Sequence, residues 1–321
     1  MMDFEIALTN NIELLPKVTI MIPTYNQEKY IVEAIESTLS QDYLNLEVVI
    51  SDDCSSDATS EIIQRFLLDN RVKYFKNPQN LGRVRNYHKT LYDYATGDWV
   101  VNLDGDDYFV DSTFISDSIK LIQDNENIVF VLASCNEGVK RARKKVKHTS
   151  IGKEELLLSG KDFFLSFFKT REFFHHSLIY NRNKAKEVGF YVNDSLISDF
   201  HSAMRLALRG NVILSSKKVA HWRTHDSNSS ITETSTFLIK NTTAFIEIAN
   251  DARQFLAQNE LKKWEEESNK FVKDRYILTV ALTGTTLKEF LYVLSNFRLK
   301  KWFISSFIKM ILRNLNISNC R

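Results

Sequence analysis

Three aspartates stand close together in Asp104-Gly105-Asp106-Asp107, directly after the apolar run Trp99 to Leu103. Gly105 allows a tight backbone turn that presents the three carboxylates together. Carboxylate oxygens are the ligands that hard divalent cations prefer, usually beside the phosphates of a substrate. The segment therefore predicts a site for Mn²⁺ or Mg²⁺ and a diphosphate, although Asp and Gly are also common in ordinary turns.

Two other polar clusters follow apolar runs in the same part of the chain. Pro23-Thr24-Tyr25-Asn26 follows Val18 to Ile22, and Asp52-Asp53-Cys54-Ser55-Ser56-Asp57 follows Glu47 to Ser51. Open α/β sheets bind ligands beyond the carboxyl ends of their strands. We therefore expect the three clusters to meet at one edge of a sheet. Asn26 and Asp57 also precede segments of helical period and are predicted to cap those helices.

The elements that must position these clusters alternate between Lys17 and Ala133. Short β-branched runs predict strands at Val18 to Ile22, Glu47 to Ser51, Val72 to Phe75, Trp99 to Leu103 and Ile128 to Leu132. Helical periodicity predicts helices around Tyr30 to Leu39, Thr59 to Leu68, Val84 to Tyr94 and Phe114 to Ile122. This alternation predicts an α/β fold with a mostly parallel central sheet between helices.

In this order the motifs resemble the large inverting glycosyltransferase family 2, which has the nucleotide-sugar-binding fold called GT-A. The matching segments are Pro23 to Asn26, Val48 to Asp57, Asn77 to Gly82 and Asp98 to Asp107, and the resemblance covers roughly residues 17 to 230. It implies a catalytic domain at 17–235, with a nucleotide-binding half at 17–133 and an acceptor-binding half at 134–235. Residues 1–16 would then form an N-terminal extension and 236–321 a helical C-terminal extension.

The resemblance also implies which residues hold the nucleotide-sugar. Thr24 and Tyr25, after Pro23, would border the nucleobase, and Asp53 would accept a hydrogen bond from it, most often from uracil. Asp52 belongs to the same expected set. Arg83 would lie near the base or the diphosphate, with a solvated Arg as the competing interpretation.

The resemblance implies different roles for the three aspartates of this acid cluster. Asp104 and Asp106, on either side of Gly105, would hold the ribose and the metal, and Asp107 would share the metal. Arg223 and His225 match an Arg-x-His-x-x-x-Ser segment, so His225 is expected at the metal or the diphosphate, and Arg223 at a phosphate or the acceptor. His175 and His176, before a predicted strand, are expected to line the acceptor pocket.

Asp199 is the residue expected to act as the catalytic base. It stands where the family usually has a Glu-Asp pair whose second member takes the proton from the acceptor hydroxyl. Ser198 occupies the Glu position, so the pair is incomplete. The alternative for Asp199 is an ordinary helix cap.

Beyond Thr236 the strand signals end, and helical patterns run through Phe237 to Ala257, Leu261 to Leu282 and Leu287 to Leu315. From Leu287 onward seven Lys and Arg stand against the single acid Glu289, among Phe and Trp residues. A basic amphipathic helix of this kind is typical of an anionic membrane interface. Packing on the catalytic domain, or on a second subunit of a homo-oligomer, is the alternative.

The bulk composition narrows the function class. The formal net charge is +2, which gives no field to attract nucleic acid. Three scattered cysteines, no secretory pattern and no apolar run of about 18 residues favour a cytoplasmic protein, with peripheral contact to the inner face of the cell membrane as a further expectation.

The expected function is a metal-dependent inverting glycosyltransferase. It would move a sugar from a nucleotide-sugar, with a UDP-sugar favoured, to a glycan or lipid-linked acceptor in bacterial surface polysaccharide synthesis. A catalytically degenerate scaffold stays open because of Ser198. A sugar nucleotidyltransferase is disfavoured because Pro23 to Glu28 contains no Gly, and a nicotinamide dehydrogenase because no G-x-G-x-x-G follows the first strand.

Overall fold

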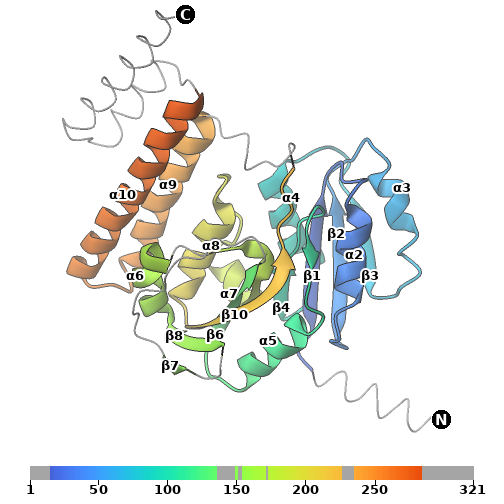
Figure 1. The fold of residues 1–321 in the computed structure, drawn as a ribbon, viewed down its shortest axis with the longest axis horizontal. Coiled ribbons are helices and arrows are strands. Elements are labelled where there is room, and N and C mark those ends of the chain that lie inside the picture. The colour runs from blue at the N-terminus through green and yellow to red at the C-terminus, as the bar shows by residue number, and fades with distance from the viewer. Residues whose placement is uncertain (1–14, 136–148, 151–153, 171–172, 226–234, 284–321) are drawn as a thin grey trace, which may run out of the picture.

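The computed structural model describes residues 15–135, 149–150, 154–170, 173–225 and 235–283, which form one mixed sheet with helices around it (Figure 1). The strands are β1 Val18–Thr24, β2 Leu46–Asp52, β3 Val72–Lys76, β4 Trp99–Asn102, β5 Tyr108–Phe109, β6 Ile128–Cys135, β7 Thr149–Ser150, β8 Glu155–Ser159, β9 Leu178–Asn181 and β10 Asn211–His221. The helices are α2 Ile31–Leu39, α3 Thr59–Gln64, α4 Arg83–Lys89, the π-turn η1 Thr90–Tyr94, α5 Phe114–Gln123, α6 Gly160–Thr170, the 3₁₀ turn η2 His175–Ser177, α7 Arg182–Glu187, α8 Ser198–Ala207, α9 Ser235–Ala252 and α10 Gln258–Thr283.

Strands β3, β2, β1 and β4 lie side by side in that order and are all parallel. Every residue of β1 and β2 is buried, as expected for parallel strands covered by helices on both faces. The register sets Thr24 opposite Asp52, and the Leu103 amide donates to the Met21 carbonyl. The polar clusters after β1, β2 and β4 therefore share one edge of the sheet.

The rest of the sheet is mixed, which corrects the expectation of a mostly parallel sheet while the α/β class is confirmed. Strand β6 does not lie beside β4, because β9 inserts between them and is antiparallel to both. Among the described strands there are four parallel and five antiparallel pairings. An apolar run marks a strand, but it does not encode the direction of the neighbouring strand.

The predicted helix caps were wrong in detail. Helix α2 begins at Ile31, and Asn26 instead has a positive φ of 53°. The Asn26 amide donates to Ser55 Oγ at 2.9 Å, and the Asn26 side-chain oxygen accepts from the Ser56 amide at 2.9 Å. Asn26 thus ties the loop after β1 to the loop after β2. The Asp57 carboxylate accepts from the Thr59 amide at 3.0 Å, although the N-cap residue of α3 is Ala58.

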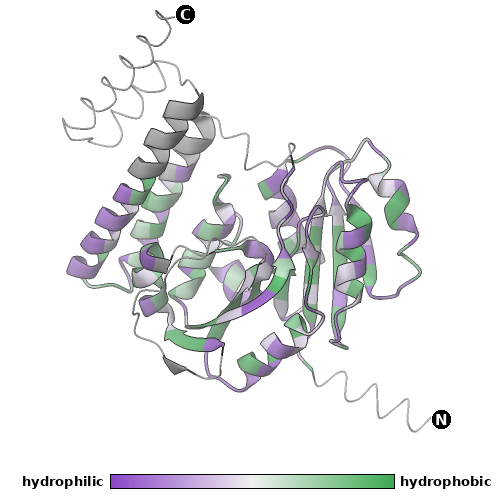
Figure 2. Ribbon diagram, viewed as in Figure 1, coloured by the Kyte–Doolittle hydropathy of each residue, from purple (hydrophilic) through white to green (hydrophobic). Residues whose placement is uncertain are grey.

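Helices α9 and α10 form the far end of the molecule from β3 (Figure 1) and pack on α6 and α8. Trp264 of α10 stacks on Phe164 of α6, with ring centroids 4.7 Å apart, and Phe168 and Phe245 lie against the same ring. Between residues 258 and 272, the residues of α10 that face away from this core are hydrophilic (Figure 2) and exposed. The described part of the 236–321 segment therefore shares a hydrophobic core with the residues before it.

Replacing Trp264 with Ala is expected to lower the free energy of unfolding by about 3–5 kcal/mol, the usual cost of a large-to-small change in a packed core. Trp264→Phe should cost less, since the buried indole N–H has no hydrogen-bond partner among the described residues. Urea denaturation of the three proteins measures both values. A loss below about 1 kcal/mol for Trp264→Ala would contradict this packing.

A buried carboxylate supports the opposite edge of the parallel strands. Glu47 is 3% exposed and contacts Lys17 at 2.9 Å, Lys73 at 2.8 Å and the hydroxyl of Thr19 at 2.6 Å. Burial alone would raise the pKa of Glu47, but the hydrogen bonds from Lys73, Thr19 and Lys17 outweigh it and lower the pKa to about 2.

This carboxylate makes stability depend on pH. Because its pKa is lower in the folded chain, its contribution is fully present above pH 4.5 and is lost as the pH falls toward about 2. Glu47→Gln should therefore be less stable than the wild type at pH 7, and the difference should shrink as the pH falls. Denaturant titrations at pH 3, 5 and 7 test this, and a difference independent of pH would contradict it.

Candidate active site

The acid cluster follows β4 at the carboxyl edge of the parallel strands. One ligand oxygen from each of Asp104, Asp106 and Asp107 lies within 4.8 Å of the others. A Cβ atom added to Gly105 would lie 2.7 Å from Thr24 Oγ1, so the loop packs directly on the end of β1. The tight turn expected at Gly105 is thus explained by close approach to another strand.

The three carboxylates differ in their surroundings. Asp104 accepts from the Tyr87 hydroxyl at 2.6 Å and contacts His175 Nε2 at 3.1 Å. Burial would raise the pKa of Asp104, but the charge and hydrogen bond of His175 outweigh it and lower the pKa. Burial and the charge of Asp104 raise the pKa of Asp106.

Burial, followed by the charges of Asp104 and Asp106, raises the pKa of Asp107 to about 8. The loop therefore holds more acidic groups than it can keep ionised by itself. Three convergent oxygen donors with excess negative charge fit a hard divalent cation, whose charge would favour the ionised form of all three.

The segment after β10 crosses the acid cluster. The Arg223 amide donates to Asp107 Oδ1 at 2.9 Å, and its guanidinium donates to the Asp106 carbonyl at 2.9 Å and pairs with Glu33 of α2. His225 Nε2 lies 2.9 Å from Asp106 Oδ2, and its ring stacks on Tyr30 at 4.9 Å. The structure therefore brings Arg223 and His225 to the acid cluster, more than 100 residues away in the sequence.

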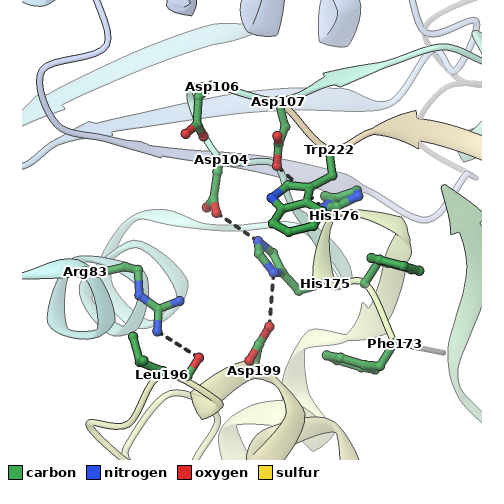
Figure 3. Close-up of a pocket in the computed structure, with 11 residues that line it drawn as sticks. Arg83, Asp104, Asp106, Asp107, Phe173, His175, His176, Leu196, Asp199 and Trp222 are labelled. Atoms are coloured by element: carbon green, nitrogen blue, oxygen red, sulfur yellow. Dashed lines mark hydrogen bonds and ion pairs between the residues drawn. The ribbon is translucent and has the colours of Figure 1, made fainter. Parts of the chain in front are cut away.

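A cavity of about 270 Å³ opens beside the cluster (Figure 3). Of the predicted site residues, those that line it are Arg83, Asp104, Asp106, Asp107, His175, His176 and Asp199. The other lining residues are Phe173, Phe174, Leu196 and Trp222. The predicted residues Pro23, Thr24, Tyr25, Asp52, Asp53, Gly105, Arg223 and His225 are not among those that line this cavity.

Asp53 fastens the segment that precedes Arg83. Its carboxylate accepts from the amides of Leu81 and Gly82, each at 2.8 Å, and from the Asn77 side chain at 2.9 Å.

Asp52, the neighbouring carboxylate, has different hydrogen-bond partners. It is fully buried and accepts from the Ser55 amide and from the hydroxyls of Ser60 and Tyr74, so its contacts tie the end of β2 to α3 and β3. Unlike the buried Asp52 and Asp53, the predicted base-binding residue Tyr25 is 46% exposed.

The guanidinium of Arg83 contacts protein groups, which differs from the competing interpretation of a solvated Arg. Its Nη2 donates to the carbonyls of Ser195 at 3.2 Å and Leu196 at 3.1 Å, and its guanidinium lies over the Tyr87 ring, 5.4 Å from the centroid. The Leu196 amide in turn donates to the side-chain oxygen of Asn241 in α9 at 3.0 Å. The loop before α8 therefore joins Arg83 to the C-terminal helices.

Asp199 lies in the first turn of α8, across the cavity from the acid cluster (Figure 3). Its Oδ1 accepts from the Phe200 amide at 2.8 Å, and its Oδ2 lies 3.1 Å from His175 Nδ1. Burial would raise the pKa of Asp199, but His175, followed by the charge of Arg83, lowers it. Ser198, at the position of the expected Glu, is fully buried.

The two histidines of η2 have different surroundings. His176 lies 3.5 Å from Asp107, and burial followed by the charge of His175 lowers the pKa of His176 to about 3. Burial would lower the pKa of His175 as well, but Asp104 and Asp199 raise it well above its usual value. Sequence reasoning placed both only at the acceptor pocket and missed the central position of His175. It also missed the aromatic lining residues Phe173, Phe174 and Trp222.

The sheet topology, with an acid cluster at the carboxyl edge of the parallel strands, defines a protein of the GT-A fold. The chain belongs to glycosyl transferase family 2, whose model matches residues 19–189. The chain is also 32% identical, over 190 residues, to the GalNAc(5)-diNAcBac-PP-undecaprenol beta-1,3-glucosyltransferase of Campylobacter jejuni. That match covers 57% of this chain and 59% of the relative's length.

Two solved structures are similar in fold. One is the TarS 1–349 fragment of Staphylococcus aureus in complex with UDP-GlcNAc, with a TM-score of 0.69 and 20% identity over 88% of this chain and 80% of that chain. The other is the mannosyltransferase PcManGT of Pyrobaculum calidifontis in complex with GDP-Man and Mn²⁺, with a TM-score of 0.57 and 19% identity over 95% and 88%.

Proposed function

We propose that this protein is an inverting glycosyltransferase that moves a sugar from a nucleotide-sugar to a hydroxyl group of a glycan or lipid-linked acceptor. The observation that carries the proposal is the single cavity with the acid cluster on one wall and Asp199 on the other. A UDP-sugar is the favoured donor, supported by the TarS neighbour with UDP-GlcNAc. The undecaprenol-linked glycan in the name of the Campylobacter relative supports an acceptor of bacterial surface polysaccharide synthesis.

On the donor side, Asp106 and Asp107, with His225 beside Asp106, would hold Mn²⁺ or Mg²⁺, which supplies positive charge that stabilises a diphosphate leaving group. Asp104 would hold the ribose, and Asp53, Thr24 and Tyr25 would border the base. A carboxylate has about four lone-pair sites, and three donors occupy three of those of Asp53, which leaves acceptor capacity for a base N–H.

On the acceptor side, Asp199 accepts the proton of the attacking hydroxyl. The hydroxyl oxygen forms the bond to the anomeric carbon as the bond from that carbon to the diphosphate oxygen breaks, and the electron pair leaves with the nucleoside diphosphate. A single displacement of this kind inverts the anomeric configuration. The pKa of Asp199 is lowered, so its carboxylate is ionised and able to accept a proton.

Within the described residues, no helix is both long enough and apolar enough to cross a membrane. The basic segment Leu287 to Leu315 lies outside the described residues, and so does the basic run Lys140 to Lys147. We propose a cytoplasmic enzyme in peripheral contact with an anionic membrane, which cosedimentation with anionic vesicles at low and high salt would test.

Nucleotide release from a panel of UDP-, GDP- and TDP-sugars, with Mn²⁺, Mg²⁺ or EDTA, tests the function. We expect release from one or more UDP-sugars that depends on the cation and rises when a lipid-linked or glycan acceptor is added. Turnover of GDP- or TDP-sugars alone would overturn the choice of donor. No turnover with any donor, in a protein that still binds UDP, would favour the degenerate scaffold.

A further inference from the structure

We propose that His175 is a positioning residue that fixes the carboxylate of Asp199 relative to Asp104, so that one side chain aligns the base with the donor-binding wall. The inference rests on the proposed function for its consequence in catalysis. The contacts of His175 with the two aspartates do not depend on that function. His175 Nε2 lies 3.1 Å from Asp104 Oδ2, and His175 Nδ1 lies 3.1 Å from Asp199 Oδ2 (Figure 3).

The backbone that carries His175 is firmly held. The turn η2 leads into β9, which pairs with both β4 and β6 in the middle of the sheet. Within this turn the Ser177 hydroxyl is 3.0 Å from the Ala133 carbonyl, and the Ser177 amide donates to the Phe174 carbonyl at 3.1 Å. A residue presented from such an element can hold a neighbour to within the tolerance that catalysis needs.

Asp199, in contrast, has few restraints of its own. Its Oδ1 bonds to the amide of the next residue, which moves with α8, whereas Oδ2 faces His175. Among the described residues, His175 is the one side chain shown within hydrogen-bonding distance of this carboxylate. The orientation of Asp199 toward the cavity therefore depends on the imidazole.

The choice of histidine follows from the shape of its side chain. The imidazole ring presents nitrogens on two different edges, so one residue can contact two carboxylates on opposite walls of the cavity. Asn and Gln carry a single nitrogen and cannot span that gap in the same way. Tyr87 restrains Asp104 from the other side through its hydroxyl at 2.6 Å, so the His175 bridge connects Asp199 to an anchored partner.

A double-mutant cycle with His175→Asn and Asp199→Asn tests the catalytic consequence. With the UDP-sugar that the wild type turns over, His175→Asn should lower kcat by about 10²-fold, the scale of a misplacement near 1 Å, with the donor KM within about threefold. Because His175 acts through Asp199, adding His175→Asn to Asp199→Asn should cost less than about a further threefold. The control is His88→Asn, which changes a histidine that stacks on Tyr92 outside the cavity.

Losses that multiply in the double variant would overturn the proposal, because His175 would then act independently of Asp199. A raised donor KM with unchanged kcat would do the same, since it would make His175 a donor-binding residue. A crystal structure of His175→Asn decides the inference without turnover. We expect the Asp199 carboxylate to turn away from its wild-type position, and an unchanged position would overturn the proposal even if the wild type proved to be inactive as a transferase.

Discussion

Asp199→Asn is expected to lower sugar transfer by about 10³-fold, within the range that general bases contribute. The amide has nearly the same shape as the carboxylate but cannot accept the proton of the attacking hydroxyl. UDP binding should stay within about twofold of the wild type, because Asp199 lies across the cavity from the acid cluster. Single-turnover transfer and calorimetric titration with UDP measure the two effects separately.

The matched control for this change is Asp42→Asn, which alters an exposed carboxylate in the loop between α2 and β2. It should retain wild-type transfer and the same thermal stability. If Asp199→Asn transferred sugar at a rate near that of the wild type, another group would have to be the base. If it lost UDP binding as well, the separation of donor and acceptor walls would be wrong.

Asp106→Ala is expected to abolish cation-dependent turnover of the donor, with a loss of at least about 10³-fold, since charge stabilisation of the leaving group is worth several kcal/mol. The substitution removes one of three clustered carboxylates, the one that lies 2.9 Å from His225 Nε2. The effect should appear in UDP binding as well. Mn²⁺ should strengthen binding of UDP to the wild type and have little effect on the variant.

Calorimetric titrations with UDP in Mn²⁺ and in EDTA test this prediction. The control is Asp42→Ala, which removes an exposed carboxylate far in sequence from the acid cluster. In EDTA the wild type and Asp106→Ala should bind UDP with similar affinity, because the difference belongs to the cation. If Mn²⁺ strengthened UDP binding to Asp106→Ala as much as to the wild type, the cation would not be held at Asp106.

The sequence was informative wherever a local pattern determines structure. Strands buried on both faces need continuous apolar runs, so β1, β2, β4 and β6 could be located, and the polar residues after β1, β2 and β4 marked the ligand edge. The place of β9 could not be predicted, because strand order depends on pairing between segments distant in the chain. The same limit explains why the sequence places Asp52 at the donor, whereas its hydrogen bonds join β2 to α3 and β3.

His175 shows why the active site could be predicted only in part from the sequence. In the sequence His175 is seen only as part of a His-His pair before a strand. Its role depends on contacts with Asp104, 71 residues earlier, and with Asp199 in α8. Asp199 could be proposed from the motif around it. The residue that orients it could be identified only after folding brought the three side chains together.

The bond between Asn241 and the Leu196 amide has a consequence for protein engineering. Leu196 lines the cavity from the loop before α8, but this loop is supported by α9. Asn241 of α9 accepts from the Leu196 amide, and the Asn193 side chain donates to Glu247 of α9 at 2.9 Å. A chimera joined between α8 and α9 would combine a loop and a supporting helix from different parents. We expect productive exchanges of acceptor preference among relatives to take Asn193, Leu196, Asn241 and Glu247 from the same parent.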